Sequence, residues 1–212
     1  MIAHPKGITV IGGGAVDDAD LTQALAVAPL LVAADGGADS ALRLGRIPDH
    51  VIGDLDSLGD HARARIAPDR IHHIAEQDST DFTKCLRRSH APLIMAVGFA
   101  GLRLDHNLAA LTAMVAPGAP RVVMLAPEDV VLAAPAHLRL DIAAGTRVSL
   151  FPMGPARGRS TGLEWPIDGL EFAPALRVGT SNRATGPVTL EIEGPMLVML
   201  PRDCLGQVLA AL

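Results

Sequence analysis

Tyrosine is absent from this 212-residue chain, and aromatic residues make up only 2% of it. Hydrophobic residues nevertheless make up 49%, which is enough for a sizeable core. The core must therefore be built mainly from Ala, Val, Leu and Ile.

Cysteine is also scarce, since only Cys85 and Cys204 are present and no CxxC pair exists. This argues against a disulfide scaffold and favours reduced cysteines in a cytoplasmic protein. Residues 1–6 lack the features of a signal peptide. The apolar run 24–34 contains Pro29 and is too short to cross a bilayer, so we expect no membrane association.

The chain also lacks an excess of basic residues, as its formal net charge of −5 shows. A nucleic-acid-binding protein normally carries a basic face, so we expect no nucleic-acid partner. A small anionic substrate stays possible if metal ions supply positive charge.

The first half alternates short apolar runs with helix-like stretches. It begins with an expected strand at 8–11, a helix that Asp17 or Asp18 caps, and a second strand at 30–34. This rhythm predicts residues 1–127 to be an α/β domain with a mostly parallel, Rossmann-like sheet.

The second half is rich in proline, with 11 of the 16 prolines after residue 116. Proline is poorly tolerated inside helices, and short strand-like runs such as 147–151, 188–192 and 196–200 remain. Residues 128–212 are therefore predicted to form an all-β sandwich.

Acidic clusters follow three expected strands of the first half. They are Asp35-Gly36-Gly37, Gly53-Asp54-Leu55-Asp56-Ser57 and Gln77-Asp78-Ser79-Thr80-Asp81. Ligands of open α/β sheets bind outside the carboxyl ends of the strands, so the clusters should converge. Gathered carboxylates repel one another unless a cation lies among them, and Mg²⁺ prefers oxygen ligands. Each cluster alone would be an ordinary turn or helix cap, but three at successive strand ends favour a metal-phosphate site.

The spacing within these clusters makes two further predictions. Asp54 and Asp56 would point to opposite sides of an extended segment, so a turn, which Gly53 permits, is needed to bring both into one site. Ser79 or Asp78 is expected to cap the following helix and leave N–H groups free for an anion.

Other motifs are weaker. Gly12-Gly13-Gly14 lacks the third glycine of a dinucleotide fingerprint and is either a phosphate-binding bend or a tight turn. No P-loop motif is present, and His72-His73 lacks zinc-site spacing. Arg103, Asp105 and His106 lie together in a strand-to-helix loop, where Arg could clamp a phosphate.

Taken in order, these motifs resemble the thiamine pyrophosphokinase family. Its D-G-G, G-D-F-D-S, Q-D-x-T-D and G-G-R-x-D-H motifs correspond to segments 35–37, 53–57, 77–81 and 101–106. Segment 160–167 is similar to T-T-G-L-x-[WY]-x-[LI], and 181–182 matches a late S-N motif. Leu55 replaces the family's Phe and Leu102 replaces a Gly, so the loop at Leu102 is expected to differ.

The resemblance implies transfer of the pyrophosphoryl group of ATP to the hydroxyl of thiamine, with Mg²⁺ as cofactor. It implies that Asp54, Asp56 and Asp81 are the catalytic metal ligands, and that Asp35 adds a ligand or positions a water. Nucleotide binding would fall to Gly36, Gly37, Arg103, Asp105 and His106. Substrate binding would fall to Gln77, Thr80, Trp165, Ser181 and Asn182, with Trp165 stacking on the cationic thiazolium ring.

The resemblance also implies a homodimer with a site shared between chains, although each site could instead be built within one chain. Three rival functions stay open. They are a pyrophosphokinase for another alcohol such as a pterin, a non-catalytic thiamine or nucleotide sensor, and a nicotinamide-dependent oxidoreductase. The broken glycine fingerprint disfavours the last, and the intact carboxylate set disfavours the sensor.

Overall fold

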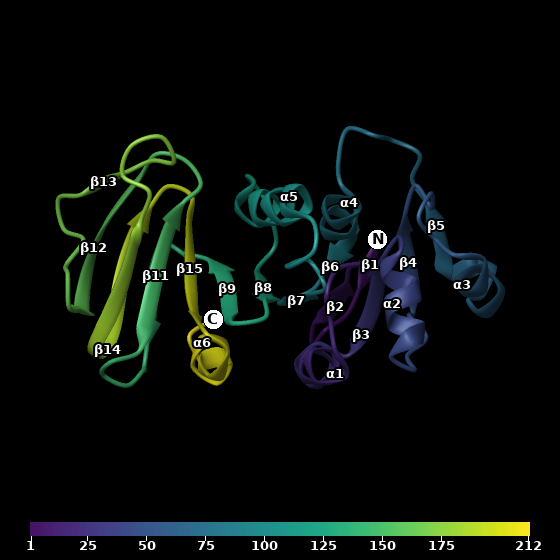
Figure 1. Cartoon of the computed structure of the whole chain (residues 1–212), viewed down its shortest axis with the longest axis horizontal. Coiled ribbons are helices and arrows are strands. Elements are labelled where there is room, and N and C mark those ends of the chain that lie inside the picture. Colours follow the sequence, from purple (N-terminus) through teal and green to yellow (C-terminus); the bar gives the residue numbers. More distant parts are fainter. The chain divides into compact units, whose positions relative to one another are not determined.

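The computed structural model describes the backbone of residues 1–212 and every side chain except that of Thr180. The chain divides into two compact units, 1–126 and 127–212. The sequence-based boundary lay between residues 127 and 128. Figure 1 shows the elements of each unit.

The sheet of the first unit has the strand order β8-β7-β2-β3-β4-β5, and every neighbouring pair in it is parallel. Its strands are β2 (Ile8–Ile11), β3 (Leu30–Ala34), β4 (His50–Gly53), β5 (Ile71–His73), β7 (Ile94–Val97) and β8 (Val122–Leu125). The strands β2, β7 and β8 are buried along their whole length. Continuous apolar runs of this kind are typical of parallel strands that are covered on both faces.

Five helices lie between these strands in the sequence: α1 (Asp18–Val27), α2 (Gly37–Arg43), α3 (Asp60–Arg65), α4 (Asp81–Arg88) and α5 (Leu104–Val115). Asp17 caps α1, as predicted, because its side chain accepts a hydrogen bond from the N–H of Asp20 at 2.8 Å. A short 3₁₀ helix, η1 (Pro68–Arg70), precedes β5. The strands β1 (Ile2–Ala3) and β6 (Ser89–His90) form a separate parallel pair.

The second unit is built from antiparallel strands. They are β9 (Asp129–Ala133), β10 (His137–Leu140), β11 (Arg147–Pro152), β12 (Ala156–Leu163), β13 (Glu171–Phe172), β14 (Thr180–Glu193) and β15 (Met196–Pro201). The long strand β14 pairs through residues 180–183 with β11, through residue 184 with β12, and through residues 188–193 with β10 and β12. Buried and less buried residues alternate along β10 and β11, as expected for strands with one face in a core.

The structure confirms that the first half contains both helices and strands and that the second half contains mainly strands. Three corrections apply to the second unit. Strand β14 begins eight residues before the expected run at 188, and neither β12 nor β13 was expected. A 3₁₀ helix, η2 (Arg202–Cys204), and a short helix, α6 (Leu205–Ala210), end the unit, which is therefore not purely β.

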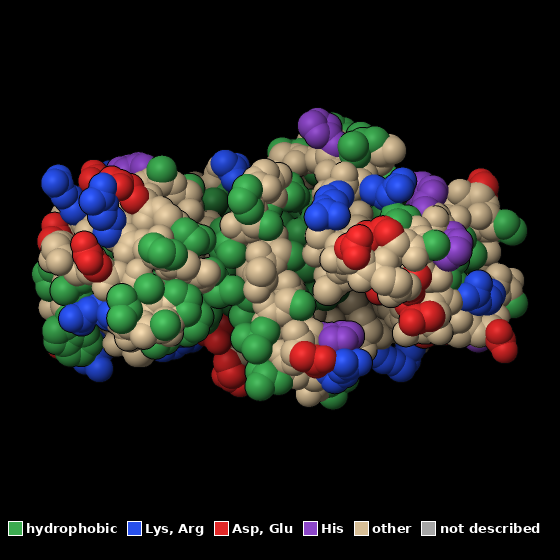
Figure 2. Space-filling view, turned by 90° about the horizontal axis from the view of Figure 1, so that it is seen from above, with side chains coloured by type: hydrophobic (Ala, Val, Ile, Leu, Met, Phe, Trp, Pro, Cys, Tyr) green, Lys and Arg blue, Asp and Glu red, His purple; other side chains and the backbone are tan. Residues whose placement is uncertain are grey.

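The surface carries mixed charge. On the face shown in Figure 2, acidic and basic side chains are interspersed and do not form one basic face. Among the residues that the structure describes, no helix is both long enough and apolar enough to pass through a bilayer.

Candidate active site

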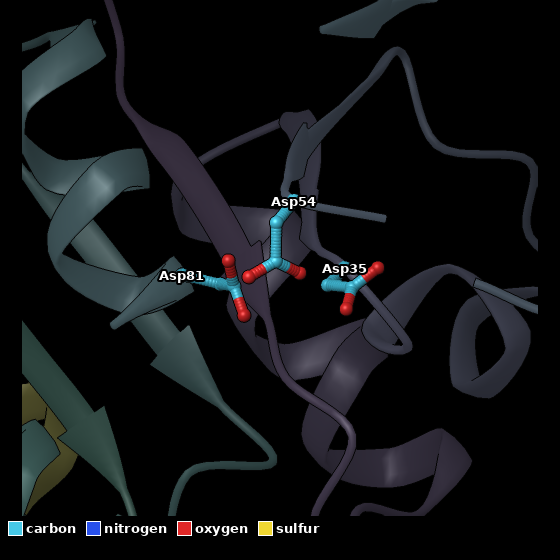
Figure 3. Close-up of side chains that lie close together, drawn as sticks. All are labelled: Asp35, Asp54 and Asp81. Atoms are coloured by element: carbon cyan, nitrogen blue, oxygen red, sulfur yellow. The ribbon is translucent and has the colours of Figure 1, made fainter. Parts of the chain in front are cut away.

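Three carboxylates of the first unit converge, as the sequence predicted. Asp35 follows β3, Asp54 follows β4, and Asp81 is the first residue of α4. One carboxylate oxygen of each lies within 4.8 Å of the others. In Figure 3 the side chain of Asp54 lies between those of Asp35 and Asp81. This group is called the acidic cluster below.

The loops that carry the cluster adopt uncommon backbone conformations. Asp35 has φ +44° and Leu55 has φ +65°, in the left-handed region that residues with a side chain seldom occupy. The turn expected in segment 53–57 therefore occurs at Leu55. Gly53 is required for a different reason, because a Cβ there would lie 2.8 Å from the Cβ of Asp35 and 3.1 Å from Oδ1 of Asp81.

Asp35 is the buried member of the cluster, with 3% of its surface exposed. Its Oδ2 accepts a hydrogen bond from the N–H of Ser57 at 3.0 Å, whereas its Oδ1 is buried and has no partner among the described residues. Burial is the main cause that raises the pKa of Asp35 to about 6, and the charges of Asp81 and Asp56 add to it. A buried carboxylate oxygen without a donor is costly, so it is suited to a cation.

Asp54 is held by two side chains. Gln77 Nε2 donates to Asp54 Oδ2 at 2.8 Å, and Lys84 Nζ lies 3.4 Å from the same oxygen. Burial alone would raise the pKa of Asp54. Hydrogen bonds from Gln77, from the N–H of Asp56 and from Lys84 outweigh this effect and lower the pKa. Asp54 is thus held in its ionised form, which is the form that binds cations.

Lys84 is a site residue that the sequence analysis missed. Its side chain is 2% exposed, and its Nζ lies 3.0 Å from Asp81 Oδ1 in addition to its contact with Asp54. Burial would lower the pKa of Lys84, but the hydrogen bonds and charges of Asp81 and Asp54 outweigh it and raise the pKa. The sequence signal that could have identified Lys84 is its position three residues after Asp81, the first residue of α4. Residues i and i+3 of a helix are neighbours on its surface.

Asp56, the fourth predicted ligand, is exposed and is not part of the group within 4.8 Å. Its Oδ1 accepts from the hydroxyl of Ser57 at 2.9 Å, and its charge contributes to the raised pKa of Asp35. Asp56 therefore lies beside the cluster and is not one of its three converging carboxylates.

The cap of α4 was predicted wrongly. Thr80 caps this helix, because its Oγ1 accepts from the N–H of Thr83 at 3.3 Å. The N–H groups of Asp78 and Ser79 are instead bound by the carboxylate of Glu76, at 2.8 and 3.1 Å. The hydroxyl of Ser79 also donates to Glu76 Oε1, so this side chain is engaged with Glu76 and does not cap the helix.

The glycines of segment 35–37 fit a close backbone approach. Gly37 begins α2, and a Cβ there would clash with the carbonyl of Ile11 at the end of β2. A side chain at Gly36 would be only 3.2 Å from the carbonyl oxygen of Ser57. Both residues thus have a packing role beside the nucleotide-binding role that the sequence predicts for them.

The predicted nucleotide loop is exposed. Arg103 donates to Asp105 through Nε at 3.2 Å and through Nη2 at 2.6 Å, so the two residues form a two-point ion pair, and His106 is exposed beside it. Leu102 has φ +57° in this loop, a conformation that favours glycine, which is the residue at this place in the motif that the segment resembles. With its amide oriented to donate, Asn107 reaches the carbonyl oxygens of Phe99, Gly101 and Arg103 at 3.0–3.2 Å.

The remaining predicted substrate residues lie in the second unit. Trp165 is 54% exposed and follows β12, whereas Ser181 and Asn182 are neighbours in β14. Ser181 is exposed, and Asn182 is 2% exposed with its amide bonded to the backbone of Trp165. Ser181 and Asn182 therefore belong to a strand and not to a turn.

Comparison with known proteins agrees with the order of the motifs. The family model "Thiamin pyrophosphokinase, catalytic domain" matches residues 21–124, which include the whole acidic cluster. The Thiamine pyrophosphokinase 1 of Arabidopsis thaliana is 26% identical, over 80% of this chain and 77% of that protein.

Solved structures share the fold. The thiamin pyrophosphokinase of Candida albicans superposes with a TM-score of 0.77 at 16% identity, over 94% of this chain and 92% of that chain. The enzyme of Geobacillus thermodenitrificans gives a TM-score of 0.71 at 23% identity, over 93% and 99%. Residues 21–124 therefore form a catalytic domain of the thiamin pyrophosphokinase family, and the curated relative and the shared fold agree with this assignment.

Proposed function

We propose that this protein is a thiamine pyrophosphokinase that transfers the pyrophosphoryl group of ATP to thiamine. The products are thiamine diphosphate and AMP. The observation that carries the proposal is the acidic cluster of Asp35, Asp54 and Asp81, which lies within the matched catalytic domain.

The cluster suits a divalent cation of the Mg²⁺ kind. Its donors are all carboxylate oxygens, which hard cations prefer, and the buried Oδ1 of Asp35 has no partner among the described residues. Asp54, Asp81 and Asp35 would hold the ion, with Asp56 as a further candidate ligand. When bound, Mg²⁺ neutralises charge on the phosphates of ATP.

The residues of the chain then contribute mainly alignment and charge. Gln77 fixes Asp54, and Lys84 fixes Asp54 and Asp81 through the contacts described above. The hydroxyl oxygen of thiamine forms a bond to the β-phosphorus of ATP and loses its proton. The bond between the β-phosphorus and the oxygen that bridges it to the α-phosphorus breaks, and AMP leaves with that oxygen.

The other assignments are part of the same proposal. Gly36, Gly37, Arg103, Asp105 and His106 would bind the nucleotide, and the exposed Arg103–Asp105 pair would open to let Arg103 meet a phosphate. The thiamine-binding part of the site would be formed by Gln77, Thr80, Trp165, Ser181 and Asn182. The homodimer with a shared site, the Rossmann-like and sandwich assignments of the two units and the cytoplasmic location stay predictions.

Product analysis tests the proposal. Purified protein is incubated with ATP, MgCl₂ and thiamine, and nucleotides and thiamine phosphates are separated by chromatography. We expect AMP and thiamine diphosphate to form in equal amounts, and none to form with a hydroxymethylpterin in place of thiamine. Formation of ADP and thiamine monophosphate would show a simple kinase, and thiamine binding without any product would show a sensor.

A further inference from the structure

The exposed Trp165 is attached to a backbone that is held on both of its polar groups. Asn182 Oδ1 accepts from the N–H of Trp165 at 3.2 Å, and Asn182 Nδ2 donates to the carbonyl oxygen of Trp165 at 2.6 Å. The side chain of Asn182 thus pairs with Trp165 in the way that a neighbouring strand would.

Asn182 is itself fixed. It is 2% exposed and lies in β14, where its backbone is in register with Val148 of β11. Its Oδ1 also accepts from the N–H of Arg183 at 2.9 Å. The amide therefore makes three hydrogen bonds inside the protein, and a buried amide with these partners has little capacity left for a ligand.

The segment that follows Trp165 has a second anchor. Ser160 Oγ accepts from the N–H of Ile167 at 3.0 Å, and the side chain of Ile167 is fully buried. On the other side, the N–H of Glu164 donates to the carbonyl of Arg183 at 2.8 Å. The backbone around Trp165 is held from both sides, yet the indole is 54% exposed.

An exposed indole on a fixed backbone is arranged for binding a flat ring. Large apolar side chains normally reduce their exposure, and loops normally move. Holding the backbone in advance lowers the ordering cost that a ligand would otherwise have to offset.

We propose that Asn182 is a positioning residue that fixes Trp165 as the platform for the cationic ring of the substrate, and that Asn182 does not contact the substrate. This inference rests on the proposed function, since thiamine supplies that cation. Ser181, its exposed neighbour, is then the member of the pair whose side chain is accessible to a ligand.

The chain is well suited to a direct test, because Trp165 is its single Trp and Tyr is absent. Intrinsic tryptophan fluorescence therefore reports on this one ring. We compare wild type, Asn182→Ala, Asn182→Asp and the control Glu193→Ala. The control removes an exposed ion pair between Glu193 of β14, the strand of Asn182, and Arg157 of β12. For each protein we measure acrylamide quenching without thiamine, quenching by thiamine, and kcat and KM.

Asn182→Ala should change acrylamide quenching in the thiamine-free protein and raise the KM for thiamine about tenfold, within the range that a cation stacked on Trp contributes. The KM for ATP and kcat at saturating thiamine should stay within twofold. Asn182→Asp keeps the acceptor oxygens and loses the donor to the Trp165 carbonyl, so it should give a smaller change in the same direction. This variant decides the question if Asn182→Ala does not fold. Glu193→Ala should match wild type.

Two results would overturn the inference while leaving the proposed function intact. One is an unchanged KM for thiamine in the folded Asn182 variant. The other is a raised KM with unchanged acrylamide quenching in the thiamine-free protein, which would mean that Asn182 touches the substrate directly. If the wild type forms no AMP with thiamine, the proposed function itself fails.

Discussion

The buried ammonium of Lys84 lies 3.0 Å from Oδ1 of Asp81, within the first turn of α4. The same nitrogen is 3.4 Å from Oδ2 of Asp54. A fixed positive charge therefore balances part of the charge of the acidic cluster, and it holds two of the three carboxylates in place.

Replacing Lys84 by Met should weaken the protein most when divalent cations are absent. The two carboxylates would lose their partner, and because they are partly exposed we expect a loss of about 1–3 kcal/mol in the free energy of unfolding. Urea unfolding with EDTA and with MgCl₂ measures this, and added Mg²⁺ should stabilise Lys84→Met more than wild type. The control is Lys6→Met, because Lys6 is the only other lysine in the sequence and is exposed. Equal stabilisation of both variants by Mg²⁺ would contradict the role given to Lys84.

Asp54 is central to the cluster, and Asp54→Asn should lower turnover by about 10²–10³-fold, as expected when a group that stabilises transition-state charge is removed. Calorimetric titration should show weaker Mg²⁺ binding, and circular dichroism should show an intact fold. Asp60→Asn, at an exposed carboxylate in the first turn of α3, is the matched control and should stay within twofold of wild type. Wild-type turnover in Asp54→Asn at ordinary Mg²⁺ concentrations would refute the metal-site assignment.

Leu102 should be a strained position. It has φ +57° and is 82% exposed, so a glycine would relieve backbone strain and lose little buried surface. The left-handed conformation costs about 1–2 kcal/mol, and the greater freedom of glycine in the unfolded chain offsets about half of it. Leu102→Gly should therefore raise the free energy of unfolding by about 0.5–1 kcal/mol in urea denaturation. Leu102→Ala keeps the strain and should change it little, and equal effects of both variants would show that φ is not the cause.

His50 should make the stability of the protein depend on pH. Burial, then the charge of His72, lower the pKa of His50, and Arg70 acts in the same direction while Asp49 and Asp69 oppose it. The Nδ1 of His50 lies 3.0 Å from the Nε2 of His72.

With a lowered pKa, the folded state binds fewer protons than the unfolded state just below about pH 6.5. The contribution to stability is therefore complete above that pH and is lost as pH falls through the folded pKa. Thermal melting at pH 7.5 and 5.0 should show a smaller decrease in Tm for His50→Gln than for wild type. His137→Gln, at an exposed histidine of β10, should keep the wild-type decrease.

The sequence by itself determined the alternation of strands and helices in the first unit and the strand ends at which the acidic clusters lie. It could do so because apolar runs, helix caps and glycines act over a few residues, as at Asp17 before α1 and at Gly53, the last residue of β4. The order of the motifs also carried the family resemblance.

Only the tertiary structure decided which side chains meet. Lys84 became part of the site because α4 packs against β4, and no local pattern assigns a helical lysine to a carboxylate 30 positions earlier. Asp56 lies beside the cluster because the chain turns at Leu55, a residue whose type does not predict a left-handed conformation. Asn182 became a partner of the Trp165 backbone because long-range pairing extended β14 through it. Contacts of this kind depend on residues distant in the chain, so they are set by packing of the whole unit and not by local preference.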